Sequence, residues 1–94
     1  MKEKILEWAK ERDLLKPENV TKQCLKLTEE VGEVASAILK SKRDEQIDAI
    51  GDIQVVLIIL AEQLGLDYDK CLEEAYMTIQ HRTGKTVTGT FIKD

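Results

Sequence analysis

The chain has 94 residues, of which 43% are hydrophobic and 34% are charged, and its formal net charge is −4. This length predicts one small domain over residues 1–94, near the size at which a single core is only modestly stabilising, so burial shared with a second chain is expected. The acidic balance argues against a nucleic-acid partner, because no basic surface would follow a phosphate backbone. Two isolated cysteines and one histidine lack the spacing of a zinc or disulfide framework.

The first predicted helix covers about residues 2–12, where apolar and charged residues alternate at helical spacing. This segment lacks the apolar core of a signal peptide, and no apolar run of the chain reaches the roughly 18 residues of a membrane span. We therefore expect a cytoplasmic protein that has no membrane partner.

A second helix is predicted over about residues 18–40. Pro17 suits its first turn, since a missing N–H at that position costs no hydrogen bond. Apolar residues recur at spacings of three and four, which predicts one buried stripe. The stripe consists of Val20, Cys24, Leu27, Val31, Val34, Ala35 and Ile38.

The third predicted helix covers about residues 44–64, with Asp44 as its N-cap and Gly65 as its C-cap. Between Ile53 and Ala61, eight of nine residues are apolar. The helix is therefore hydrophobic nearly all round and needs neighbours on every side. Because one short chain can hardly supply them, we predict that a homo-oligomer, a dimer or a tetramer, buries this helix.

The last part of the chain predicts a fourth helix over about residues 69–82, which Asp67 or Asp69 can start. Residues 83–94 are rich in glycine and threonine and predict an ordered tail or a short strand pair. The fold class expected from these elements is all-α, a four-helix bundle completed by oligomerisation, with a short non-helical C-terminal tail.

Acidic residues gather at two places on the predicted helices. Glu29, Glu30 and Glu33 lie within one turn of each other, and Asp48 and Asp52 share a face of the third helix. With the apolar stripe centred on Val31, Glu30 borders the core and Glu33 faces whatever packs beside the helix.

Partly desolvated carboxylates need a counter-charge, and oxygen ligands from two helices suit Mg²⁺, with Mn²⁺ as a substitute. A ferritin-like di-iron site is set aside because it needs two Glu-x-x-His pairs. Gly32 and Gly51, beside the acids, suggest that a backbone or a bulky ligand comes close. The alternative is that the acids form a solvated face and the glycines allow a tight helix crossing.

The segment "EEVGE" (29–33), followed by "DAIGDIQVVLIILAEQ" (48–63), resembles the MazG-like family of all-α nucleoside triphosphate pyrophosphohydrolases. The family pattern is EExxE, a spacer, and ExxD. Glu29, Glu30 and Glu33 match its first half, and Asp52 matches its last residue. The ExxD glutamate falls on Ala49, and the nearest acid is Asp48. The tail "HRTGKTVTGTFIKD" is similar to the ending of short, phage-type members.

The resemblance implies that a nucleoside or deoxynucleoside triphosphate is hydrolysed between its α and β phosphates, giving the monophosphate and pyrophosphate. It also implies that the acids bind Mg²⁺, through Glu30, Glu33 and Asp52, with Asp48 as the candidate for the missing fourth ligand. Glu29 or Glu33 is expected to accept the proton of the attacking water.

Other side chains are candidates for contact with the substrate. Arg82, Lys85 and Lys93 would bind phosphate, with Lys22 and Lys26 as weaker candidates. Gln23 would contact the base or ribose, and Trp8 would stack on the base, although a core or interface anchor is the other reading of this tryptophan.

Two other functions stay open at this point. The absence of a glutamate at position 49 allows a catalytically silent helical oligomer that binds nucleotide or a protein partner. The same fold with another substrate, as in phosphoribosyl-ATP pyrophosphohydrolases, is the third reading.

Overall fold

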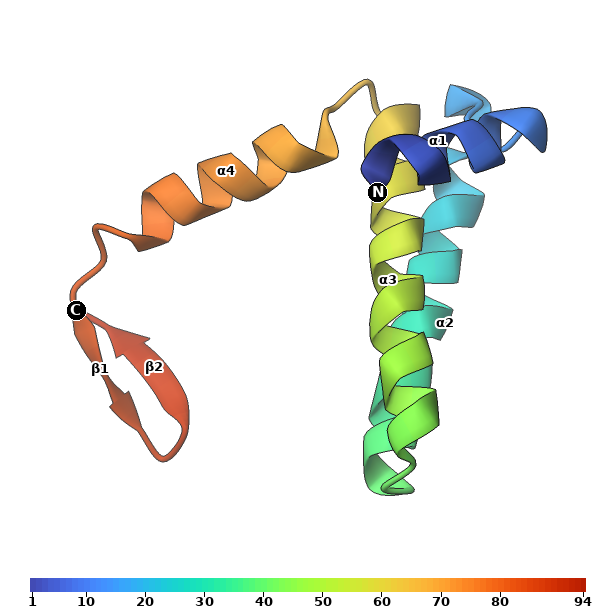
Figure 1. The fold of residues 1–94 in the computed structure, drawn as a ribbon. Coiled ribbons are helices and arrows are strands. Elements are labelled where there is room, and N and C mark those ends of the chain that lie inside the picture. The colour runs from blue at the N-terminus through green and yellow to red at the C-terminus, as the bar shows by residue number, and fades with distance from the viewer.

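The computed structural model describes residues 1–94 and is mainly helical, as predicted. The four helices are joined by short loops, and the chain ends in an antiparallel hairpin (Figure 1). The elements are α1 (Lys2–Glu11), the 3-10 turn η1 (Pro17–Asn19), α2 (Val20–Leu39), α3 (Arg43–Gln63), α4 (Tyr68–Ile79), β1 (Gly84–Val87) and β2 (Thr90–Lys93). The all-α class is therefore confirmed, and the tail is the short strand pair.

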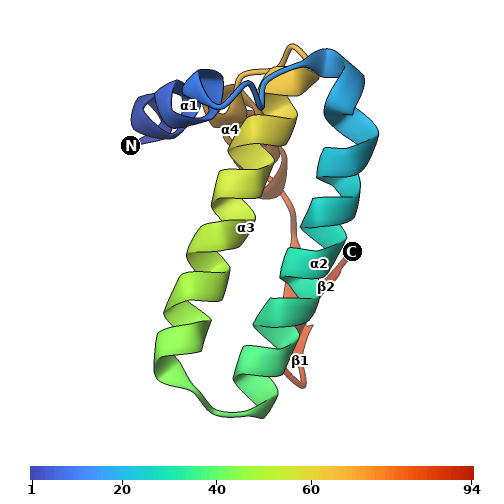
Figure 2. The same ribbon diagram turned by 90° about the vertical axis from the view of Figure 1, so that its right-hand side faces the viewer.

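Helices α2 and α3 lie side by side and antiparallel, and α1 packs across the end of α3 (Figure 2). We call α1, η1, α2 and α3 the body. All buried residues belong to it, and most lie on α3. They are Ala9, Glu30, Ala37, Ala49, Val56, Ile58, Ile59, Ala61 and Gln63. Several are alanines, and no large side chain is fully buried, so the core of the single chain is thin.

The helices of the body end in the same way. Asp13, Ser41 and Gly65 adopt positive φ values of 61°, 55° and 73° just after α1, α2 and α3. The next residue in each case donates its N–H to a carbonyl five residues earlier, as Leu66 does to Ala61 at 2.8 Å. This is the Schellman motif, which favours glycine. The predicted stop at Gly65 is confirmed.

Some predicted helix boundaries were wrong. Asp44 does not cap α3, which begins at Arg43 after Lys42, so Asp44 lies in the first turn, where it still favours the positive helix end. Residues 17–19 form a 3-10 turn before α2, and α4 ends at Ile79 instead of residue 82. The predicted start of α4 is confirmed, because the Asp67 carboxylate accepts hydrogen bonds from the backbone N–H groups of Asp69 and Lys70.

The predicted buried stripe of α2 was also wrong by about one residue. Val31 and Ile38 are 54% and 59% exposed, whereas Glu30 and Ala37 are buried. The face of α2 that packs on α3 is therefore centred beside Glu30. Of the predicted stripe, three residues are half-buried and four are exposed, namely Val20, Leu27 and Val34 against Cys24, Val31, Ala35 and Ile38.

Helix α4 and the hairpin form an arm that leaves the body. The axes of α3 and α4 meet at a bend of 103°, and the hairpin packs on none of the helices (Figure 1). Every residue from Asp69 to Asp94 is exposed. The radius of gyration is 15.8 Å, against about 12 Å for a compact domain of this length. In this chain α4 does not complete the predicted bundle.

Helix α3 is only partly covered by the rest of the chain. Ile53, Val55, Leu57 and Leu60 are half-buried within the apolar run. No single helix is long and apolar enough to span a membrane, and α3 and α4 pass that test only together, as the bent pair. The tight-crossing reading of Gly32 and Gly51 has no support within the chain, because a Cβ added at either position would meet no atom within 4 Å.

Candidate metal and nucleotide site

Three carboxylates meet where α2 and α3 face each other. Glu30 and Glu33 project from successive turns of α2, and Asp52 projects from α3. One oxygen from each lies within 4.8 Å of the other two. The sequence prediction that these acids come together is thus matched by the geometry, and we call Glu30, Glu33 and Asp52 the acidic cluster.

Glu30 is the buried member of the cluster, with only 5% of its surface exposed. Its Oε1 lies 3.3 Å from the Lys26 ammonium, one turn earlier on α2. Its Oε2 has no hydrogen-bond partner in the protein. An unpartnered buried carboxylate oxygen is costly, since burial removes its hydration and nothing replaces it. This oxygen is a strong sign that the cluster accommodates a cation.

The charges in the cluster raise the proton affinity of its members. The negative charge of Glu30, together with desolvation, raises the pKa of Glu33 above its ordinary value. Desolvation, followed by the charges of Asp48 and Glu30, raises the pKa of Asp52. The hydrogen bond to Glu30 raises the pKa of Lys26, which therefore stays charged. One lysine, Lys26, faces three acids, so the protein alone does not neutralise the negative charge of the cluster.

The donor set fits a hard divalent cation. Three carboxylate oxygens from two rigid helices are ligands that Mg²⁺ and Mn²⁺ accept, and such ions complete their shell with water and substrate phosphate. The orphaned oxygen of Glu30 supplies the structural reason for this fit. Glu30, Glu33 and Asp52 are the residues that would hold the ion.

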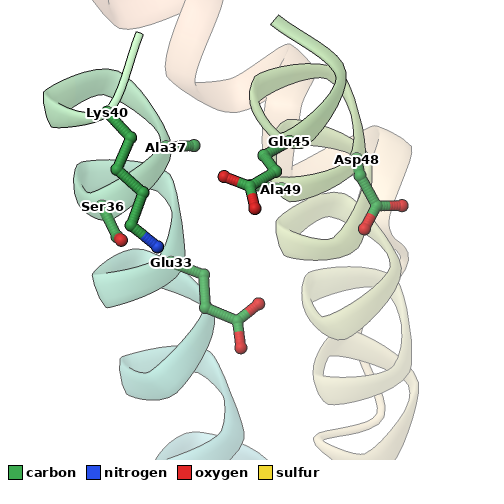
Figure 3. Close-up of a pocket in the computed structure, with 7 residues that line it drawn as sticks. All are labelled: Glu33, Ser36, Ala37, Lys40, Glu45, Asp48 and Ala49. Atoms are coloured by element: carbon green, nitrogen blue, oxygen red, sulfur yellow. The ribbon is translucent and has the colours of Figure 1, made fainter. Parts of the chain in front are cut away.

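A cavity of about 210 Å³ continues from the cluster toward the α2–α3 loop. Figure 3 shows Glu33 and Glu45 pointing into the space between the helices, while Asp48 points away from α2. Ala49, at the position where the family pattern has glutamate, is buried and faces α2. Asp48 is absent from the cluster of converging ligand atoms.

Glu45 is a residue that the sequence reasoning missed. It lines the same cavity as Glu33 and lies on the side of α3 that carries Ala49 and Asp52, at spacings of four and seven. Those spacings were the available sequence signal for Glu45, which lines the cavity together with the predicted Asp48.

A second cavity, of about 450 Å³, lies on the other side of Lys26, between α1, η1, α2 and α3. It brings together Trp8 and Gln23, two of the residues predicted to contact the substrate. Lys22 and Lys26 also line it, and the Arg12 guanidinium lies over the Trp8 ring at 4.4 Å from the centroid. The remaining residues of the wall are Leu14, Asn19, Val55, Val56, Ile59 and Gln63. We call this space the side cavity.

The other predicted site residues lie elsewhere. Glu29 is exposed and lies 3.7 Å from Lys26. Arg82 follows α4, and Lys85 and Lys93 lie on β1 and β2, all on the arm. Because the hairpin packs on no helix, these three cations do not reach the acidic cluster of their own chain in this conformation.

The family comparison agrees with this arrangement. The model of the phosphoribosyl-ATP pyrophosphohydrolase family matches residues 2–88. The chain belongs to this family. The family lies within the all-α NTP pyrophosphatase superfamily that also contains the MazG-like proteins, so the predicted relationship holds at that level. The narrower label, a short phage-type MazG-like protein, stays a prediction.

One curated relative is an uncharacterized 18.2 kDa protein in the rep-hol intergenic region of Haemophilus phage HP1 (strain HP1c1). It is 44% identical over 63 residues, which is 67% of this chain and 39% of that protein. This chain therefore matches well under half the length of that relative. No solved structure matches this chain significantly.

Proposed function

We propose that this protein is a Mg²⁺-dependent nucleoside triphosphate pyrophosphohydrolase that converts a (d)NTP to the (d)NMP and pyrophosphate. The observation that carries the proposal is the acidic cluster with its orphaned, buried Glu30 oxygen. Family membership supports it, because the family is named for pyrophosphate release from a nucleotide. Mn²⁺ is expected to substitute for Mg²⁺, since both accept oxygen ligands.

The residues have distinct roles in this proposal. A bound Mg²⁺ would neutralise phosphate charge and make a bound water more acidic. Glu30, Glu33 and Asp52 would fix the position of the ion between α2 and α3. Glu29 or Glu33 would accept the proton of the attacking water.

Phosphate contacts are proposed for two groups of cations. Lys22 and Lys26 line the side cavity, Lys26 also pairs with Glu30 of the acidic cluster, and both would contact a bound triphosphate directly. Arg82, Lys85 and Lys93 would reach the substrate from the arm of a second copy, which the exposed arm and its charge support. Residues 80–94 carry three cations and one carboxylate, a net +2, so the total of −4 leaves −6 for the rest of the chain.

A homo-oligomer, a dimer or a tetramer, is part of the proposal. Exposed apolar side chains cover both the outer face of α2 and the arm, among them Val31, Ile38, Leu72, Tyr76 and Phe91. Such surfaces are typical of interfaces, and burial against a second copy would also complete the bundle around α3. We propose a cytoplasmic location with no membrane or nucleic-acid partner.

Pyrophosphate release tests the proposal directly. The purified protein is incubated with Mg²⁺ and a panel of standard and modified nucleoside triphosphates together with phosphoribosyl-ATP. We expect release from at least one triphosphate, loss of release on chelation, and a loss of about 100-fold or more in Asp52→Asn. Asp44→Asn, in the first turn of the same helix and outside the cluster, is the matched control and should keep full activity. No release from any compound would refute the enzyme proposal.

Two observations support alternative functions. Buried Ala49, where the pattern has glutamate, favours a catalytically silent oligomer that binds nucleotide or a protein partner. The family match favours phosphoribosyl-ATP as the substrate. Nucleotide binding without pyrophosphate release would support the first alternative, and release from phosphoribosyl-ATP alone would support the second.

A further inference from the structure

The wall of the side cavity on α3 begins at Val55, about one turn after Asp52 of the acidic cluster, and runs to Gln63. Lys26 lines the cavity and also pairs with Glu30, so the two sites share a side chain. Gln63 lines the same cavity and is 11 residues from Asp52 on α3, about 16 Å at 1.5 Å per residue. A nucleotide whose phosphates lie at the cluster would therefore direct its base toward the Gln63 end.

Gln63 is unusual because it is polar and only 4% exposed, and only one of the two polar atoms of its amide has a hydrogen-bond partner. Its Nε2 donates a hydrogen bond to the Leu14 carbonyl at 2.8 Å, and its Oε1 has no partner in the protein. A carbonyl can only accept, so this bond fixes the orientation of the amide and leaves the oxygen as the free group. A buried acceptor of this kind costs about 1–3 kcal/mol unless a donor reaches it.

Gln23 repeats this pattern on the facing helix. Its Nε2 donates to the Val56 carbonyl at 3.3 Å, so one N–H of its amide is also engaged by the backbone of α3. Of the two amide oxygens, Gln63 Oε1 is the buried acceptor that has no partner in the protein, and its residue lines the cavity. The remaining wall combines an apolar part, formed by Trp8, Leu14, Val55, Val56 and Ile59, with a polar part, formed by Asn19, Lys22 and Lys26. Such a combination suits a flat ring that carries an N–H donor at its edge.

We propose that the side cavity binds the nucleobase and that Gln63 Oε1 accepts a hydrogen bond from an exocyclic amino group. This inference rests on the proposed nucleotide substrate. Adenine, cytosine and guanine carry such a group. Uracil and thymine carry a carbonyl oxygen where cytosine has its amino group, and this oxygen would face the Gln63 acceptor without a hydrogen bond. Bases with an amino group are therefore selected over uracil and thymine.

Binding is measured without hydrolysis by the fluorescence of Trp8, the single tryptophan of the chain. The wild-type protein is titrated with AMP and with purine riboside monophosphate, and with CMP and UMP. In at least one pair, we expect the ligand with the amino group to bind about tenfold more tightly, since a site built around a hydrogen bond rejects an analogue that leaves it unmade. Equal affinity within both pairs would overturn the inference, independently of the affinities measured for the variants below.

Gln63→Met, which keeps the length of the side chain and removes the amide, locates the effect. The preference within the selective pair should shrink to less than about twofold, while the affinity for base-free ribose 5-phosphate stays unchanged. A uniform loss of affinity that includes ribose 5-phosphate would show a ribose contact or a purely structural role and would refute the assignment. Gln80→Met, on the exposed segment after α4, is the control.

The two proposals fail separately in these experiments. Selective binding of amino-bearing monophosphates without pyrophosphate release from any triphosphate would refute the enzyme proposal and keep the base site. Pyrophosphate release with no amino preference would keep the enzyme and refute the role of Gln63.

Discussion

The body and the arm are held by different forces. In the body, α2 and α3 bury alanines, β-branched residues and one glutamate against each other, and α1 closes one end. The arm has no buried residue and meets the body only at the α3–α4 bend and through Lys2, which pairs with Asp67 and Asp69. The acidic cluster and the side cavity lie wholly in the body, whereas the basic end of the chain lies on the arm.

This difference shows how the two regions depend on their surroundings. The body holds the acidic cluster and the side cavity within one chain, whereas the proposed phosphate contacts Arg82, Lys85 and Lys93 lie on the arm. The arm presents apolar side chains and positive charge with nothing in its own chain to receive them. We therefore expect substitutions of carboxylates on the body to lower activity, and substitutions of apolar side chains on the arm to weaken assembly.

Removing the charge of Glu30 is the change with the largest expected effect. Glu30→Gln should lower pyrophosphate release by about 100-fold or more, since loss of a metal ligand exceeds the 10- to 100-fold cost of losing an outer-shell partner. Mg²⁺ should raise the melting temperature of the wild type and leave that of the variant unchanged, because an ion stabilises only a fold that binds it. Both are read by activity assay and thermal unfolding.

Glu73→Gln on the arm is the matched control for Glu30→Gln. It removes one negative charge from an exposed helix face and should change neither activity nor the response to Mg²⁺. Equal losses in the two variants would mean that overall charge, rather than the cluster, governs the protein.

The arm is tested by making its apolar stripe polar. Leu72 and Ile79 are 61% and 52% exposed, so Leu72→Gln and Ile79→Gln should hardly affect a lone chain. If the stripe packs on a second copy, each change should raise the dissociation constant of the oligomer at least about tenfold. Light scattering over a concentration series measures this. Lys70→Gln, on the opposite side of α4, is the control, and unchanged assembly in all three variants would rule out the stripe as the interface.

The smallest effect is expected where the arm joins the body. Lys2 lies 3.0 Å from Asp67, and their hydrogen bond lowers the pKa of Asp67. A carboxyl group whose pKa is lowered by folding stabilises the fold above its unfolded pKa of about 3.9. That stabilisation is lost as the pH falls through the folded value.

Lys2→Met should therefore lower the melting temperature by less than about 5 °C near pH 7, because the pair is at the surface. The difference from the wild type should shrink as the pH falls below about 4 and disappear below the lowered pKa of Asp67. A difference that persists in acid would assign the effect to packing of the lysine chain instead. Lys4→Met, on the same helix without an ion pair, is the control.

Sequence patterns predicted much of the fold because most of its signals are local. The end of α3 follows from Gly65 and the start of α4 from Asp67, because the effects of these residues reach only a few positions. The third helix and the strand pair were likewise evident from periodicity and composition. The end of α4 and the start of α3 were missed, since the competing residues there have similar propensities.

The candidate site was predicted less completely. Helical spacing placed Glu30 and Glu33 together, and the family pattern added Asp52 and led to Asp48. Asp48 and the unpredicted Glu45 both line the cavity, but neither belongs to the cluster of converging ligand atoms. Gln63 gave no signal, because nothing in the sequence indicates that a polar residue near a helix end will be buried with one hydrogen bond made and one unmade.

The sequence by itself determined which segments are helical, where most of them stop, and that acids on two helices could converge, because backbone propensity, capping and helical spacing act over one or two turns. Only the tertiary structure decided which face of α2 is buried, that Glu30 rather than Val31 faces α3, and that α4 leaves the body. Those outcomes depend on which surfaces of distant segments cover each other, and an amphipathic pattern with two apolar faces is compatible with more than one arrangement.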